Sequence, residues 1–229
     1  MFFFSPDYFY LILFTSPALL LAVWAQYRVK TAYHQAQQIP APLSGAAAAR
    51  HVLDSAGLQD VAIEQVPGFL SDHYDPRHKV LRLSPDNYQR RTVAAVGIAA
   101  HEAGHAIQDA QNYAPLVVRN AVVPVAGIGS NVAIWLAIIG MIMQMNALLL
   151  AGIGLFAAVV FFQVVNLPVE FNASARAKQQ LVALEIVDRE KMKYVNRVLD
   201  AAALTYVAAT LQAILTLLYL ILRYSGSRD

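Results

Sequence analysis

The chain has 229 residues, of which 58% are hydrophobic and only 14% are charged. Soluble proteins average about 45–50% apolar and about 25% charged residues, so this composition favours several membrane spans with one modest globular lobe. The net charge is only +2, and no basic stretch stands apart from nearby acids, which argues against a nucleic-acid partner. Cysteine is absent, which excludes disulfides, thiolate metal sites and a cysteine nucleophile.

Four apolar runs approach or exceed the roughly 20 residues that a bilayer core demands. They predict transmembrane helices at residues 7–27, 121–143, 147–167 and 201–222. We interpret the first run as a retained anchor, because it has no basic lead-in and no clear cleavage site follows it. Only residues 144–146 separate the second run from the third, so these two are expected to form a tight hairpin.

Basic residues concentrate in two segments, with nine at 28–119 and six at 176–197. Four spans place both segments on the same side of the membrane, and the positive-inside rule makes that side the cytoplasm. We therefore predict a multi-pass plasma-membrane protein with both termini outside. Its extramembrane lobe, residues 28–118, would lie inside.

Helix signals are clear in this lobe. Ser44 is a candidate N-cap of an alanine-rich helix over 44–57. A second helix is predicted to begin after Ser84, to break near 89–91 and to resume through 92–110.

The 92–110 helix carries His101-Glu102-Ala103-Gly104-His105. A spacing of four places both imidazoles on one face, where they can bind one ion. Glu102 is placed to accept a proton from water activated by that ion, which makes it the candidate catalytic base. We predict one zinc ion per chain; spacing alone does not distinguish zinc from cobalt or manganese, but zinc is the usual occupant. The alternative is a solvated polar patch.

Glu170 is the predicted third ligand. The hairpin returns the chain to the same side of the membrane just before it, and Pro168 is interpreted as the start of a helix over 168–199. Small residues at Ala173 and Ala177 would let this helix approach the His101 helix. The alternative is a first-turn glutamate that interacts with the helix dipole.

Three segments, HEAGHAIQDA, SDHYDPRHKVLRLS and LPVEFNASARA, resemble the YugP-type family of membrane zinc metallopeptidases, and the similarity covers nearly the whole chain. More distantly, the chain is similar to HtpX-type proteases and CAAX prenyl endopeptidases. The resemblance implies zinc binding by His101, His105 and Glu170, with Glu102 as general base. It also implies a mainly α membrane protein with a small α+β, gluzincin-like lobe. Distant relatives usually carry Asp four residues after the ligand Glu; here Ser174 stands there, which puts its role in orienting an imidazole in question.

Substrate contacts are predicted from the same resemblance. Alternation indicates short strands at 61–66 and 79–83, and an exposed strand edge in such peptidases pairs with extended substrate. The candidate edge is Leu81, Arg82 and Leu83. Candidate polar groups around the substrate are His73, Tyr74, His78, Asn172 and Arg176, and ordinary packing or surface exposure is the alternative for each of them.

The sequence thus predicts a zinc-dependent endopeptidase that acts on membrane or unfolded protein substrates near the cytoplasmic membrane face. The rival is a membrane scaffold or quality-control partner with a structural zinc site, closed by His73 or His78 as a fourth ligand. Glu185 and Glu190 are weaker ligand candidates. A transporter is disfavoured, because the spans carry no mid-membrane ionisable residue. A membrane-protein partner and a homo-oligomer both remain open.

Overall fold

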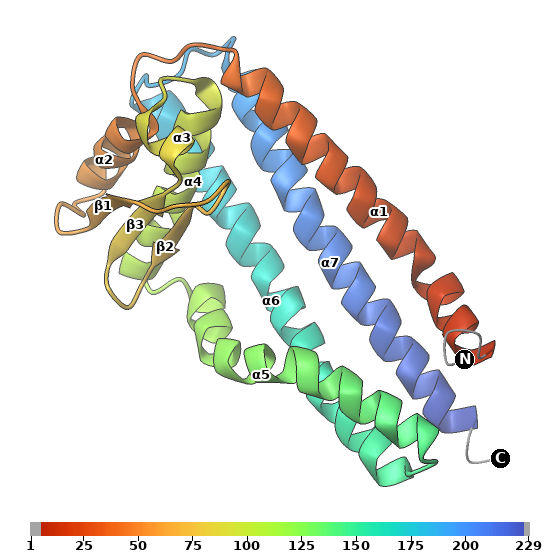
Figure 1. Cartoon of the computed structure of the whole chain (residues 1–229). Coiled ribbons are helices and arrows are strands. Elements are labelled where there is room, and N and C mark those ends of the chain that lie inside the picture. Colours follow the sequence, from red (N-terminus) through yellow and green to blue (C-terminus); the bar gives the residue numbers. More distant parts are fainter. Residues whose placement is uncertain (1–5, 227–229) are drawn as a thin grey trace. The chain divides into compact units, whose positions relative to one another are not determined.

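The computed structural model describes the backbone of residues 6–226, and their side chains except at positions 6–8, 128, 130 and 131. Helices dominate (Figure 1). The elements in chain order are α1 (Pro6–Gln37), α2 (Gly45–Ser55), β1 (Ala62–Gln65), β2 (His73–Asp75), β3 (Val80–Leu83), α3 (Pro85–Gln89), α4 (Val93–Ala110), α5 (Ala114–Ile142), α6 (Asn146–Ala183) and α7 (Met192–Gly226).

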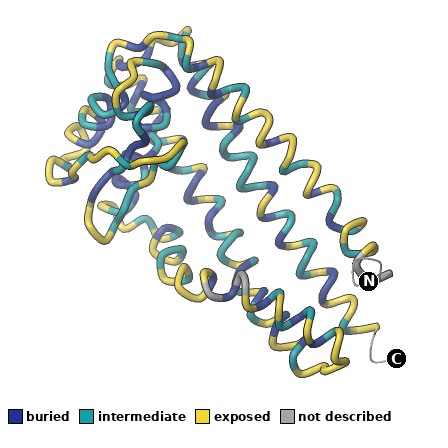
Figure 2. The backbone as a smooth tube through the Cα atoms, in the orientation of Figure 1, coloured by how far each residue is buried: buried dark blue, intermediate teal, exposed yellow. Residues whose placement is uncertain are grey.

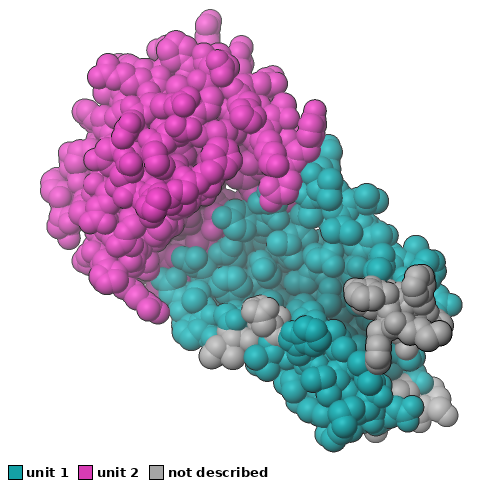
Figure 3. Space-filling view, in the orientation of Figure 1, with its two compact units in different colours: residues 1–25, 118–167, 205–229 teal, residues 26–117, 168–204 magenta. Residues whose placement is uncertain are grey.

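The chain divides into two compact units (Figure 3). The first, which we call the helical unit, consists of Met1–Ala25, Val118–Leu167 and Thr205–Asp229. The second, which we call the lobe, consists of Gln26–Val117 and Pro168–Leu204. Helices α1, α5, α6 and α7 each contribute residues to both units.

Among the residues that the structure describes, three helices, α1, α6 and α7, are long and apolar enough to cross a membrane. Helix α5 bends by 45° between Ala114–Gly127 and Val132–Ile142, and it adds a fourth span if the two pieces act as one. Exposed residues recur along the long helices (Figure 2). Among them Leu20, Trp135 and Phe161 are each more than half exposed. Large apolar side chains in such numbers are suited to lipid rather than to water.

The helical unit contains the tight hairpin that the sequence predicts between α5 and α6. A Cβ atom at Gly140 would lie 2.5 Å from the backbone nitrogen of Leu149, and one at Gly152 would lie 2.7 Å from that of Ala137. These two glycines therefore allow the hairpin helices to touch through their backbones, as small residues do in membrane bundles.

The predicted lobe helices are confirmed, and so is the Ser44 cap. The Ser44 hydroxyl accepts a hydrogen bond from the Ala47 backbone N–H at 3.3 Å. Thr92 caps α4 in the same way through the Ala95 N–H. Ser84 precedes α3 but its hydroxyl donates to the Asp72 carboxylate instead. The core of the lobe packs α2, α4, the sheet and the adjoining parts of α6 and α7 around fully buried aliphatic side chains.

The sheet differs from the prediction. It has three strands in the order β1-β3-β2, with β1 parallel and β2 antiparallel to β3. The predicted edge Leu81, Arg82 and Leu83 is wrong, because β3 is the central strand and is paired on both sides. Leu81 and Leu83 are fully buried, and the Arg82 guanidinium binds carboxylates of both neighbouring strands. The reason is the additional strand β2, which is too short and polar to be recognised by alternation.

The interpretation of Pro168 as a helix start is also wrong. Helix α6 runs without interruption from Asn146 to Ala183, with Pro168 in its interior. A proline removes only one backbone donor, and long membrane helices tolerate it. The chain breaks instead after Ala183, where Glu185 has a positive φ of 52°, before α7 begins at Met192.

Candidate metal centre

Three ligand-type side chains converge within the lobe. Glu170 Oε2 lies 3.4 Å from Nε2 of His101 and 3.7 Å from Nε2 of His105. One potential ligand atom from each residue lies within 4.8 Å of the others. Within the part of the chain that the structure describes, His73, His78, Glu185 and Glu190 do not join this group. Glu170 lies far from both ends of α6, so the first-turn alternative does not apply.

The close approach of α4 and α6 explains why the three side chains meet. His101 and His105 are one turn apart on α4, and Gly104 lies beside His105. A Cβ atom at Gly104 would lie 2.7 Å from the Ala173 carbonyl oxygen, so only glycine permits this spacing. Ala173 is fully buried, as the predicted small-residue contact requires. Glu170 lies one turn before Ala173 and is thereby held near the imidazoles.

Each imidazole is held at the nitrogen that faces away from Glu170. His101 Nδ1 lies 3.1 Å from the Ser174 hydroxyl. His105 Nδ1 lies 3.0 Å from the Gln108 side-chain oxygen. These contacts aim both Nε2 atoms at the shared space beside the carboxylate, which is how partners of metal-binding histidines usually act.

Gln108 was not predicted from the sequence. It is fully buried, and its amide donates to the Val169 carbonyl oxygen at 2.8 Å and to Asn172 Oδ1 at 3.0 Å. Arg176 donates to the same Asn172 oxygen at 2.6 Å and to Gln111 Oε1 at 2.7 Å. Asn172 and Arg176 thus bind each other and helix α4. The available signal was a glutamine three residues after a candidate ligand histidine, on the same helix face.

Glu102 is buried at 8% exposure beside the histidines. Burial raises the pKa of its carboxyl above the usual range. A raised carboxyl pKa suits proton transfer near neutral pH. Burial works to lower the pKa of His105, but the Glu170 and Glu102 carboxylates and the Gln108 side chain together raise that pKa above its usual value.

The residues present fit a zinc ion. Glu170 Oε2 is buried and makes no hydrogen bond, although two imidazole nitrogens face it. A cation shared with those nitrogens would satisfy this oxygen. Two imidazoles and one carboxylate form a donor set that zinc accepts, and three protein ligands leave a coordination place for water.

The other predicted polar groups lie around β2. His73 is exposed, with Nδ1 2.9 Å from the Ser71 carbonyl oxygen, and His78 Nδ1 lies 2.7 Å from Asp75 Oδ2. The Tyr74 hydroxyl donates a hydrogen bond of 3.0 Å to Oδ2 of Asp109. Asp109 lies on α4, one turn after His105. Burial and this bond raise the pKa of Tyr74. Of the three predicted donors, Tyr74 is therefore the one bonded to the helix that carries the histidines.

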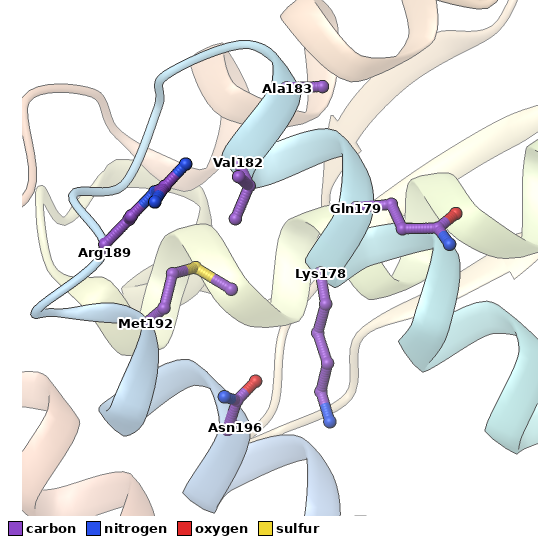
Figure 4. Close-up of a pocket in the computed structure, with 7 residues that line it drawn as sticks. All are labelled: Lys178, Gln179, Val182, Ala183, Arg189, Met192 and Asn196. Atoms are coloured by element: carbon purple, nitrogen blue, oxygen red, sulfur yellow. The ribbon is translucent and has the colours of Figure 1, made fainter.

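A pocket of about 590 Å³ adjoins the end of α6 and the start of α7 (Figure 4). Its lining residues are Lys178, Gln179, Val182, Ala183, Arg189, Met192 and Asn196. None of them belongs to the converging group, so this pocket is separate from the candidate centre.

Comparison with known proteins decides the family. Residues 10–225 match the family described as "Putative neutral zinc metallopeptidase". The chain belongs to this family. It is also 44% identical over 220 residues to "Putative membrane protease YugP" of Bacillus subtilis (strain 168), covering 95% of this chain and 98% of that protein. No solved structure gives a significant match.

The resemblance predicted from HEAGHAIQDA and its companion segments is thereby confirmed. Family membership and the long apolar helices together make this chain a membrane protein of the zinc metallopeptidase class. The converging group lies on two of the three segments that carried the resemblance.

Proposed function

We propose that this metallopeptidase is a zinc-dependent endopeptidase of membrane or unfolded protein substrates, acting near the cytoplasmic membrane face. The observation that carries the proposal is the convergence of His101, His105 and Glu170 beside the buried Glu102. His101 and His105 would bind zinc through Nε2, and Glu170 through its carboxylate.

When bound here, zinc supplies Lewis acidity, which polarises a peptide carbonyl and lowers the pKa of water to about 7. Glu102 takes the proton from the attacking water. It then delivers that proton to the nitrogen of the leaving amine. Its carboxyl has no hydrogen-bond partner among the described residues, so it is available to accept.

Extended substrate needs a free strand edge, and β2 supports this role in place of β3. Strand β2 pairs on one side with β3, and the described strands include no partner for its other side. The Tyr74–Asp109 hydrogen bond ties β2 to α4. The outer edge of His73–Asp75 is thus our candidate for backbone pairing with the substrate.

The rival function, a scaffold with a structural zinc site, requires a fourth protein ligand. His73 and His78 were the candidates, and neither is in the converging group. The geometry therefore favours an open site and catalysis.

The test is Glu102→Gln in the purified full-length chain. We expect cleavage of an unfolded protein substrate to be abolished while zinc content stays at the wild-type level. Membranes that contain this variant should accumulate the natural substrates, which comparative proteomics would reveal. Cleavage retained by the variant would refute the base assignment, and a zinc-loaded wild-type protein that cleaves nothing would favour the scaffold.

A further inference from the structure

Gln108 links the second histidine to the backbone of the helix that carries Glu170. Its side-chain oxygen lies 3.0 Å from His105 Nδ1, and its nitrogen donates to the Val169 carbonyl oxygen at 2.8 Å. Val169 immediately precedes Glu170. A single fully buried amide therefore holds one candidate ligand directly and the backbone beside another.

The orientation of this amide is fixed by its partners. The Val169 carbonyl can only accept, so the NH₂ group of Gln108 must face it. Asn172 Oδ1 also accepts from Gln108, and it accepts from Arg176 Nε as well, which can only donate. A reversed amide would place oxygen against oxygen at both positions. The oxygen of Gln108 must therefore face His105.

This orientation selects one tautomer of His105. Because Gln108 offers an acceptor, the imidazole must carry its proton on Nδ1 to donate to it. The lone pair then lies on Nε2, which faces Glu170 at 3.7 Å. His101 is less constrained, since the Ser174 hydroxyl at its Nδ1 can either donate or accept.

We propose that Gln108 is a positioning residue, which fixes the metal-binding tautomer of His105 and couples that imidazole to the backbone beside Glu170. Because Gln108 is fully buried and its polar atoms bind His105, Val169 and Asn172, it would act through the ligands rather than on substrate or metal. The inference rests on the proposed zinc site but not on peptide hydrolysis.

The experiment measures zinc affinity of the purified full-length chain by competition with a chelator. Gln108→Met keeps the side-chain volume and removes all three hydrogen bonds, to His105, Val169 and Asn172. We expect it to bind zinc about 10- to 100-fold more weakly than the wild type, the usual loss when a partner of a ligand histidine is removed. The matched control is Gln179→Met, an exposed position of α6, which should keep the wild-type affinity.

The absorption spectrum of bound cobalt adds a second measurement, which would not change if Gln108 contributed only to packing. The visible bands of the cobalt-loaded Gln108→Met protein should shift from those of the wild type, because the His105 ligand is reoriented. If that variant does not fold, Gln108→Asn replaces it. The asparagine side chain is one methylene too short to reach both His105 and the Val169 carbonyl, so this variant should show the same loss of zinc affinity.

A variant with a lower melting temperature but wild-type zinc affinity and cobalt bands would overturn the proposal. Failure of the proposed function would give a different result. The wild type would bind zinc and Gln108→Met would bind it more weakly, but neither protein would show cleavage that depends on Glu102.

Discussion

The two candidate histidine ligands are held by different chemical groups, a hydroxyl at His101 and an amide at His105. We expect Ser174→Ala to lower zinc affinity about 10-fold, because the His101 ring loses the group that orients it. Ser174→Asp should bind zinc at least as tightly as the wild type, since a carboxylate makes the imidazole more basic. Chelator competition measures both variants. Equal affinity in Ser174→Ala and the wild type would show that His101 needs no support from Ser174.

For individual residues, the sequence predicted the relative positions of side chains that lie on one helix. The proximity of His101 and His105 follows from their spacing of four on α4. The nearness of Glu170 was accessible through the hairpin topology. The bond from Gln108 to Val169 was not accessible, because it joins two residues 61 positions apart and depends on the distance between their helices.

At the scale of elements, the approach of α4 to α6 is the structural condition for the site. Gly104→Ala would place a methyl group 2.7 Å from the Ala173 carbonyl oxygen and so would push the helices apart. We expect a loss of about 1–3 kcal/mol in stability from overpacking, together with a loss of bound zinc. Thermal melting and metal analysis measure the two effects.

The matched control is Gly154→Ala in α6, where an added Cβ meets no atom within 4 Å. It should melt at or slightly above the wild-type temperature, because alanine favours helix more than glycine does. If Gly104→Ala behaves like this control, the close packing of α4 on α6 does not limit the site.

The sequence predicted the lobe helices correctly but not the strand order or the role of Pro168, and each outcome has a physical reason. Helix α2 was predictable because Ser44 satisfies a free backbone donor at the helix start, whereas the corresponding cap of α4 by Thr92 was seen only in the structure. Strand β2 was missed because three polar residues show no alternation, and without it β3 was mistaken for an edge. Pro168 was misread because a proline ends most helices in water, whereas long membrane helices tolerate it.

At the scale of the whole molecule, the distribution of basic residues predicts which side of the membrane carries the lobe. The chain has no cysteine, so the labelling of a single introduced cysteine reports the side of the membrane on which that position lies. Lys79→Cys, in the lobe, should stay unlabelled by a membrane-impermeant maleimide in intact cells and should react after lysis. Met145→Cys, in the turn between α5 and α6, should be labelled in intact cells. The reverse pattern would place the lobe outside.

The most direct test of the proposed zinc site is the metal content of purified wild-type and Glu170→Gln protein, measured by mass spectrometry after dialysis against a weak chelator. The substitution keeps the size of the side chain and removes the charged ligand. We predict about one zinc ion per wild-type chain, little zinc in the variant, and loss of proteolysis along with the metal. A variant that retains a full complement of zinc and cleaves substrate at the wild-type rate would contradict the assignment of Glu170 and with it the proposed centre.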